Sequence, residues 1–161
     1  MTEVEIRRSL VNSSKSETTA VTFPPALHDV VWEDLEYFGW RDPKLPQRGY
    51  IIAQVDGEPI GLMVRAADSR MSSGRSLQCV LCRSVHKADR MSLFTAKRTG
   101  PAGRNGDTVG TYICADLDCS QHIRIPPLVT PLQPDPEAAV AERIAGLLER
   151  LNSFIGNVTR A

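Results

Sequence analysis

The 161-residue length suits one ordinary domain, alone or with a small appendage, and 42% hydrophobic with 24% charged residues is a globular composition. The net charge is zero, and no run of about 18 apolar residues occurs, which excludes a membrane-spanning helix. Residues 1–8 contain no apolar segment of the secretory-signal type. We therefore expect a cytoplasmic protein with reduced thiols.

Two helices are expected before the first strands. Residues 3–12 place Ile6 and Leu10 on one helical face and acidic residues in the first turn, which favours a short amphipathic helix. Apolar residues at helical spacing predict a second helix over 27–40. These residues are Leu27, Val31, Leu35 and Phe38.

Two pairs of strands follow. Residues 50–55 and 59–64 are joined at Asp56-Gly57, the strongest short-range signal for a hairpin. Their apolar runs suggest a sheet that the preceding helix covers on one face. Residues 91–97 alternate as a strand and are expected to pair with 108–114. The long, glycine-rich segment between them predicts a protruding loop.

The cysteines of the chain form two close pairs. Cys79 and Cys82 are separated by two residues, Cys114 and Cys119 by four. Four thiolates are the ligand set that Zn²⁺ prefers at a structural site. Residues five apart in one regular helix point about 140° away from each other. We therefore expect Cys114 to end a strand and Cys119 to lie in the first turn of a helix. A thiol knuckle, a hairpin and a ligand at a helix start together predict a treble clef that holds one zinc ion.

Other interpretations of the cysteines remain open at this point. Two disulfides would suit a secreted protein, and a redox Cys-x-x-Cys would need no second pair. His86 and His122 lie near the cysteines in the sequence, and each could replace one of them as a ligand.

The charges are unevenly distributed along the chain. Residues 70–105 contain 8 basic residues and only one acidic residue, Asp89, for a net charge of +7, whereas residues 1–69 and 106–161 carry −4 and −3. Such a basic patch attracts an acidic protein surface or a nucleic-acid backbone, although a solvated charged face is the plainer interpretation. The basic residues are Arg70, Arg75, Arg83, Lys87, Arg90, Lys97, Arg98 and Arg104.

The C-terminal part begins with a proline-rich linker over 127–135. Within 136–161, residues 136–155 carry an apolar stripe at helical spacing, with Glu137 in the first turn. This helix is expected either to dock on the body or to bind a partner at the end of a tether.

No motif for catalysis is recognisable. The chain lacks glycine-rich phosphate loops, a Gly-x-Ser-x-Gly elbow and a His-Glu-x-x-His helix, and four thiolates would leave a zinc ion no open position for substrate. We expect a binding module of the α+β class, with a small antiparallel sheet, N-terminal helices and an added C-terminal helix. Residues 1–126 would form the main domain, with the zinc finger over about 75–126.

Five segments together form a pattern that is specific to one family: 35–43 (LEYFGWRDP), 48–50 (RGY), 56–62 (DGEPIGL), 79–82 (CVLC) and 103–120 (GRNGDTVGTYICADLDCS). They resemble the FusB-type elongation factor G-binding proteins, whose shared module is also called the fibronectin-binding-protein C-terminal treble-clef zinc finger. The similarity covers roughly residues 3–126 and is closest to the short actinobacterial branch; the linker and the last helix lie outside it.

The resemblance implies a four-cysteine zinc domain that binds translation elongation factor G (EF-G). In the resistance members, this binding releases EF-G that fusidic acid has stalled on the ribosome. Carried onto this sequence, the contact face includes Phe94, Lys97, Arg98 and Arg104. The competing hypothesis is a zinc-containing RNA- or DNA-binding protein that uses the same basic residues, although the scarcity of aromatic residues there disfavours base stacking.

Overall fold

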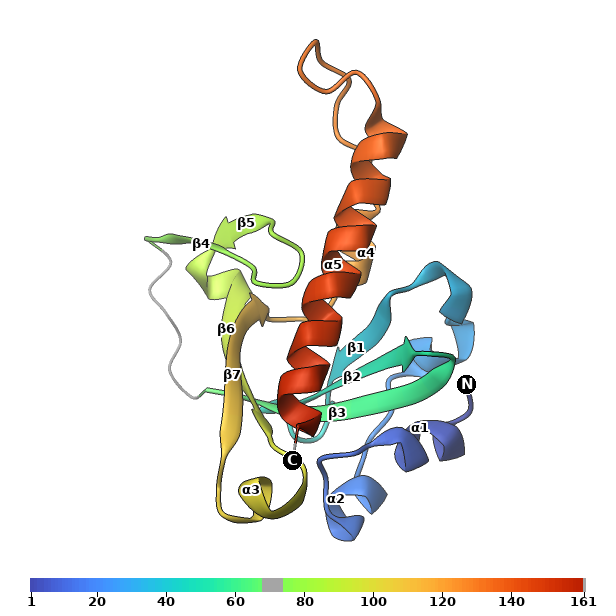
Figure 1. The fold of residues 1–161 in the computed structure, drawn as a ribbon, viewed down its shortest axis with the longest axis vertical. Helices are drawn as coiled ribbons and strands as arrows, with labels where there is room; N and C mark the ends of the chain where they lie inside the picture. The colour runs from blue at the N-terminus through green and yellow to red at the C-terminus, as the bar shows by residue number, and fades with distance from the viewer. Residues whose placement is uncertain (68–73, 161) are drawn as a thin grey trace.

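An antiparallel sheet of five strands forms the centre of the computed structural model, which describes residues 1–67 and 74–160 (Figure 1). The strand order is β1-β2-β3-β6-β7. The strands are β1 (Tyr37–Arg41), β2 (Arg48–Val55), β3 (Glu58–Ala66), β6 (Met91–Lys97) and β7 (Thr108–Cys114). A small separate ladder pairs β4 (Ser76–Gln78) with β5 (Val85–Lys87). The predicted α+β class is confirmed.

The helices are short except for the last one. The α-helices are α1 (Glu3–Ser9), α2 (Lys15–Thr19), α3 (Gly100–Arg104), α4 (Cys119–Ile123) and α5 (Pro136–Thr159), and the 3₁₀ helices are η1 (Pro25–Asp29), η2 (Trp32–Asp34) and η3 (Ala88–Arg90). The first helix ends before the predicted boundary because Leu10 bridges Gly61 of β3. The segment expected as a protruding loop contains α3 instead.

Both predicted hairpins form. Between β2 and β3, Asp56 and Gly57 have φ values of 53° and 84°. Positive φ at both central residues is the requirement of a type I′ turn, whose twist matches that of the flanking strands. Strands β6 and β7 have the predicted bounds and pair from Met91 with Cys114 to Lys97 with Thr108. This register brings Cys114 to the end of the sheet where the first cysteine pair lies.

The prediction of a helix over 27–40 is wrong. The segment contains two 3₁₀ turns and then β1, which pairs with β2 along its whole length. Phe38 and Trp40 point to the same face of the strand, where their rings stack with centroids 5.5 Å apart. Their spacing of two places both rings on one face only in an extended strand. Pairing with β2 and burial of these rings therefore override the helical spacing of the earlier residues.

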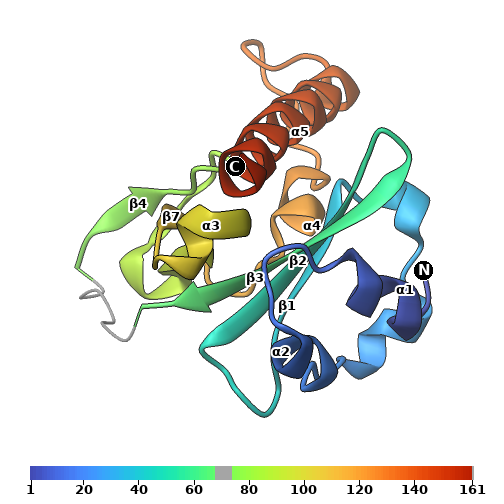
Figure 2. The same ribbon diagram turned by 60° about the horizontal axis from the view of Figure 1, so that its bottom comes forward.

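The sheet is buried on both faces, not on one as expected. Along β2, Ile51 and Ala53 join the core shared with the cysteines, whereas Tyr50 and Ile52 join a second core beneath α1 and the 3₁₀ turns. This alternation follows from the two-residue period of a strand. Figure 2 shows α1 and α2 on one side of the sheet and α5 on the other.

Helix α5 docks on the body, so the first of its two predicted arrangements is the one observed. Leu147, Leu151 and Val158 are fully buried in the same core cluster as the four cysteines. The Nε of Arg150 donates a hydrogen bond of 2.6 Å to the carbonyl of Leu81, within the first cysteine pair. No helix in the described ranges is both long and apolar enough to cross a membrane.

The C-terminal end of α5 is capped by residues distant in sequence. The backbone N–H of Thr99 donates to the carbonyl of Val158 at 3.0 Å, and its hydroxyl donates to that of Thr159 at 3.1 Å. The guanidinium of Arg98 donates to the carbonyl of Asn157. These donors satisfy carbonyls that have no partner within the helix, and the positive charge of Arg98 complements the negative end of the helix dipole.

We predict that Leu151→Ala lowers the free energy of unfolding by about 2–5 kcal/mol, because it opens a cavity in the core beneath α5. The matched control is Leu148→Ala, since Leu148 is 37% exposed and Leu151 is 0% exposed; it should cost about 0.5 kcal/mol. Urea denaturation of both variants measures the difference. Equal effects would contradict the docking of α5.

Candidate metal centre

The first cysteine pair lies in a tight knuckle between β4 and β5. The backbone N–H of Cys82 donates to the Sγ of Cys79 at 3.4 Å, and the N–H of Arg83 donates to the carbonyl of Cys79 at 3.0 Å. The N–H of Cys79 donates in turn to the carbonyl of Ser84 at 2.9 Å. Arg83 has a φ of 61°, which lets the chain reverse immediately after the second thiol. The knuckle therefore holds both sulfurs on one side of the turn.

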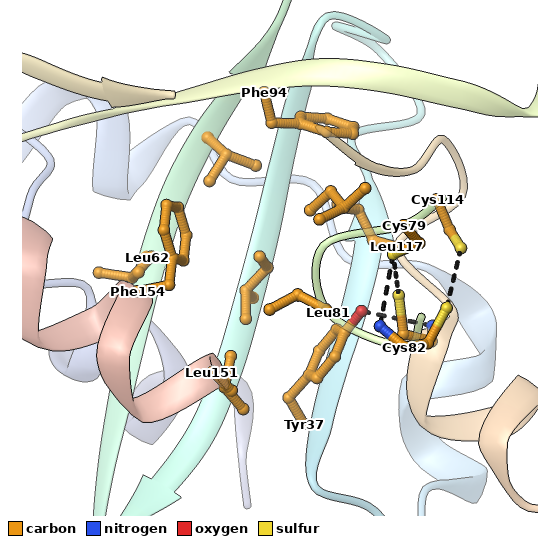
Figure 3. Packing of buried hydrophobic residues seen from close by; sticks show 14 of the residues in the cluster. Tyr37, Leu62, Cys79, Leu81, Cys82, Phe94, Cys114, Leu117, Leu151 and Phe154 are labelled. Carbon is orange, nitrogen blue, oxygen red and sulfur yellow. Dashed lines mark hydrogen bonds between the residues drawn. The ribbon is translucent and has the colours of Figure 1, made fainter. Parts of the chain in front are cut away.

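The second pair has the arrangement predicted from its spacing. Cys114 is the last residue of β7, and Cys119 is the first residue of α4. Between them, the N–H of Leu117 donates to the carbonyl of Cys114 at 3.0 Å, and Leu117 has a φ of 60°. This turn directs the thiols of Cys114 and Cys119 toward the knuckle. Figure 3 shows the thiol of Cys114 beside those of Cys79 and Cys82.

The four sulfurs have the spacing that a zinc ion requires. All lie within 4.8 Å of one another, with 3.6 Å between Cys79 and Cys119 and 3.7 Å between Cys82 and Cys114. A tetrahedron with Zn–S bonds of about 2.3 Å has S···S edges of about 3.8 Å. All four residues are buried free cysteines, so the disulfide interpretation does not hold. The cluster is a site for one zinc ion.

Electrostatics also favour a cation at this site. Hydrogen bonds from Cys114 and Cys119 lower the pKa of Cys79 to about 7 and lower the pKa of Cys82 as well. The hydrogen bond with Cys119 raises the pKa of Cys114. Without a metal, the cluster therefore shares protons, because four buried negative charges at this distance repel each other. A divalent zinc ion supplies the missing positive charge and keeps every coordinating thiol ionised.

Residues of strand β1 form hydrogen bonds that position the second cysteine pair. The N–H of Cys119 donates to the hydroxyl of Tyr37 at 3.3 Å, and the N–H of Tyr37 donates to the Oγ of Ser120 at 3.1 Å. Burial and the nearby Cys119 raise the pKa of Tyr37 well above its ordinary value, so the hydroxyl stays protonated. The guanidinium of Arg41 donates to the carbonyl of Ala115 at 3.2 Å. The sequence showed no sign of these roles, because the segment was predicted to be helical.

Gly39 of β1 allows this close packing. A Cβ at this position would lie 2.4 Å from the carbonyl oxygen of Leu117 and 2.8 Å from its side chain. No L-residue with a side chain fits there without displacing the turn between Cys114 and Cys119. The sequence Phe-Gly-Trp is part of the first segment that resembles the family. The reason for its glycine could not be predicted, because it depends on contact with Leu117, 78 residues further along the chain.

The two histidines are neighbours of the site and not part of it. Within residues 1–67 and 74–160, the one cluster of metal-ligand side chains consists of the four cysteines. His122 contacts the carboxylate of Asp118 at 2.8 Å, and its ring lies edge-on to that of His86, with centroids 5.4 Å apart. The hypothesis that a histidine replaces a cysteine is therefore not supported.

Comparison with protein families agrees with this geometry. The family model described as the FBP C-terminal treble-clef zinc-finger matches residues 5–158. The chain belongs to this family. The FBP-type match includes α5, which the sequence resemblance had placed outside the shared module. Comparison with curated proteins and with solved structures found no match.

The FBP-type fold changes the interpretation of the four predicted contact residues. Phe94 is 0% exposed in the core beneath the site, so the expectation that it contacts a partner does not hold in this structure. Lys97, Arg98 and Arg104 line one shallow hollow with a volume of about 340 Å³. The guanidinium of Arg98, however, caps α5. Lys97 and Arg104 are exposed.

The basic residues do not form one continuous surface. Lys97 ends β6, whereas Arg90 immediately precedes it, so the two are separated by roughly 20 Å of extended strand. Arg75, Arg83 and Lys87 belong to the region of β4, β5 and the knuckle, near the Arg90 end. Arg70 lies outside the described residues, as does part of the polar segment before β4.

We predict about one zinc ion per purified chain, and a loss of both metal and thermal stability in Cys82→Ser, because zinc binding is coupled to folding. Val80→Ser is the control: Val80 lies in the same knuckle, 41% exposed, and is no ligand. Elemental analysis and thermal melting measure the two effects. A metal-free protein with an unchanged melting temperature would rule out a structural zinc site.

A second prediction concerns the contact between β1 and the cysteine turn. Gly39→Ala should destabilise the protein by about 1–3 kcal/mol and weaken zinc retention against a chelator, because the new methyl group displaces Leu117. Gly110→Ala is the control, since a Cβ there would meet its nearest atom at 3.5 Å. If both alanine variants keep zinc equally well, β1 does not position the second cysteine pair.

Proposed function

We propose that this protein is a zinc-stabilised adaptor that binds translation elongation factor G in the cytoplasm, either free or on the ribosome. The observation that carries the proposal is membership of the FBP C-terminal treble-clef zinc-finger family across almost the whole described chain. The resemblance to FusB-type proteins suggests the partner. In this proposal, binding promotes release of the factor from the ribosome, as in the resistance members.

The architecture supports binding in preference to catalysis. The four thiolates would complete the coordination of a zinc ion, so the metal has no open position for a substrate or an activated water. The space beside the cysteines, between His86, Asp118 and His122, is too small to hold a water molecule. The metal then acts on function through the fold, by holding β6, β7 and their connection in place.

The hollow at the end of β6 is the surface that we assign to electrostatic recognition. Lys97 and Arg104 are exposed on its rim, and neither forms an ion pair within the part of the chain that the structure describes. Opposite charges on a partner accelerate association and select the correct orientation. We propose that these two residues face an acidic surface of the factor, while Arg98 serves mainly to hold α5.

The competing proposal is nucleic-acid binding through the basic residues near the knuckle. Its support is the group formed by Arg75, Arg83, Lys87 and Arg90, all of them exposed. Stacking on bases would require exposed aromatic rings, and among the described residues of β6 and β7 only Tyr112 offers one, since Phe94 is buried. This scarcity makes nucleic acid the second candidate.

We predict that the double variant Lys97→Glu/Arg104→Glu raises the Kd for purified EF-G at least about tenfold at low salt, mainly by slowing association. The difference should shrink as salt rises, because exposed charges are screened within about 8–10 Å at physiological ionic strength. Arg98 is left unchanged so that α5 stays docked. Zinc content should not change, since neither residue is a ligand.

The control is Arg8→Glu/Lys44→Glu, which reverses two exposed charges elsewhere on the protein. Surface plasmon resonance across a salt series, with EF-G and with a random RNA, separates the two proposals. Binding to RNA with a steep salt dependence, together with no binding to EF-G, would reject the adaptor proposal in favour of the nucleic-acid one.

A further inference from the structure

Among the residues that the structure describes, the largest concentration of exposed apolar side chains lies before α5. Leu132 is 96% exposed, Leu128 87%, Val129 69% and Ile125 64%. We call residues 125–132 the apolar tip. In Figure 1 the tip projects beyond the N-terminal end of α5, away from the sheet. Exposed apolar residues are unremarkable singly, but a contiguous group marks an interaction site.

The tip has a defined backbone conformation. Thr130 and Gln133 exchange two backbone hydrogen bonds, at 3.1 and 2.9 Å, and the hydroxyl of Thr130 accepts a third from the N–H of Gln133. The guanidinium of Arg143 on α5 donates to the carbonyl of Ile125 at 3.1 Å. Prolines at 126, 127, 131 and 134 restrict φ along the segment. A turn held in this way loses little conformational entropy on binding.

The proposed electrostatic surface offers much less apolar area than the tip: among the residues that line the hollow, the large exposed apolar side chain is Val11, which is 42% exposed. Phe94, the aromatic residue nearest to Lys97 in sequence, is fully buried. Charged rim residues speed association, but most of the affinity of a protein interface comes from a few apolar or aromatic side chains that become buried. A stable complex therefore needs an anchor elsewhere on the molecule, and the apolar tip is where such side chains are concentrated.

The charge beside the tip indicates the kind of surface it fits. Residues 125–143 contain three acidic residues and one basic residue, Arg143, whose guanidinium donates to the carbonyl of Ile125, so their net charge is −2. Arg124, immediately before the tip, pairs with Glu36. This negative charge disfavours an anionic membrane or a nucleic acid, and it disfavours contact between the tips of two copies. It suits an apolar pocket on a protein whose rim is basic. The acidic residues are Asp135, Glu137 and Glu142.

We infer that the apolar tip is the anchor by which this protein holds its partner, inserting Leu128 and Leu132 into an apolar pocket with a basic rim. The inference rests on the proposed function, which makes that partner EF-G. Thr99, two residues from Lys97, binds the opposite end of α5. The tip and the Lys97 hollow are thus separated by about the length of the 24-residue helix, roughly 36 Å. The partner must present a correspondingly large surface.

The test is the affinity of the full chain for purified EF-G, measured by surface plasmon resonance. Leu128→Ser/Leu132→Ser should raise the Kd at least about tenfold, mainly through faster dissociation, because anchors act on the lifetime of a complex. The control is Val4→Ser/Val31→Ser, which removes two valines that are 56% and 55% exposed; it should bind as the unmodified protein does. Zinc content and melting temperature should be the same for all three proteins.

The possible results are distinguishable. If the unmodified protein binds EF-G and the tip variant binds equally well, the inference is wrong and the proposed function stands. If the unmodified protein does not bind EF-G at all, the proposed function fails, and the assignment of the tip's partner fails with it.

Two further measurements test whether the tip binds a second copy of this protein or a membrane instead of EF-G. Sedimentation velocity of the unmodified protein and the tip variant would reveal self-association through the tip. Flotation with phosphatidylcholine vesicles, with and without phosphatidylglycerol, would reveal insertion into a membrane. Tip-dependent association in either measurement, without a tip effect on EF-G, would overturn the inference.

Discussion

The need to neutralise four buried thiolates governs this structure. In the sequence, the β6–β7 hairpin separates Cys79 and Cys82 from Cys114 and Cys119. In the structure, all four sulfurs lie within 4.8 Å of one another. Four negative charges at that distance in a protein interior are tolerable only with a cation among them. A zinc ion held by the four cysteines would therefore link the knuckle to the end of β7 and the start of α4. Folding of this half of the molecule and metal binding become one process.

The four cysteines form part of the hydrophobic core. The cysteines share one cluster with the inward face of β2 and with α5, so the zinc finger, the sheet and the last helix stabilise each other. Two sets of contacts along α5 extend this coupling: Arg150, near the middle of the helix, donates to Leu81 in the knuckle, and Arg98 and Thr99 cap the C-terminal end. Consequently, two residues that were predicted to contact a partner stabilise the fold instead: Phe94 is buried in the core, and Arg98 caps α5. The FBP-type family match covers the cysteines, the sheet and α5 together.

This division of roles shapes the functional proposals. With Phe94 in the core and Arg98 at the end of α5, the surface beside α3 keeps the charges of Lys97 and Arg104, with Val11 as its large exposed apolar side chain. Charge attracts a partner over distance, whereas apolar contact holds it. The apolar tip lies at the other end of the same helix, so α5 sets the separation between the two candidate contacts. The helix packs on the same core cluster that contains the four cysteines.

Much of the architecture was readable from local patterns. The cysteine spacing predicted the ligands and the strand-to-helix step between Cys114 and Cys119, and Asp56-Gly57 predicted the turn between β2 and β3. These features depend on neighbours in sequence, whose backbone preferences and spacing suffice to predict them. Strand β1, the fit of Gly39 against Leu117, and the roles of Phe94 and Arg98 could not be read in this way. Each depends on contact with a segment far along the chain, and only the folded structure decides which distant residues meet.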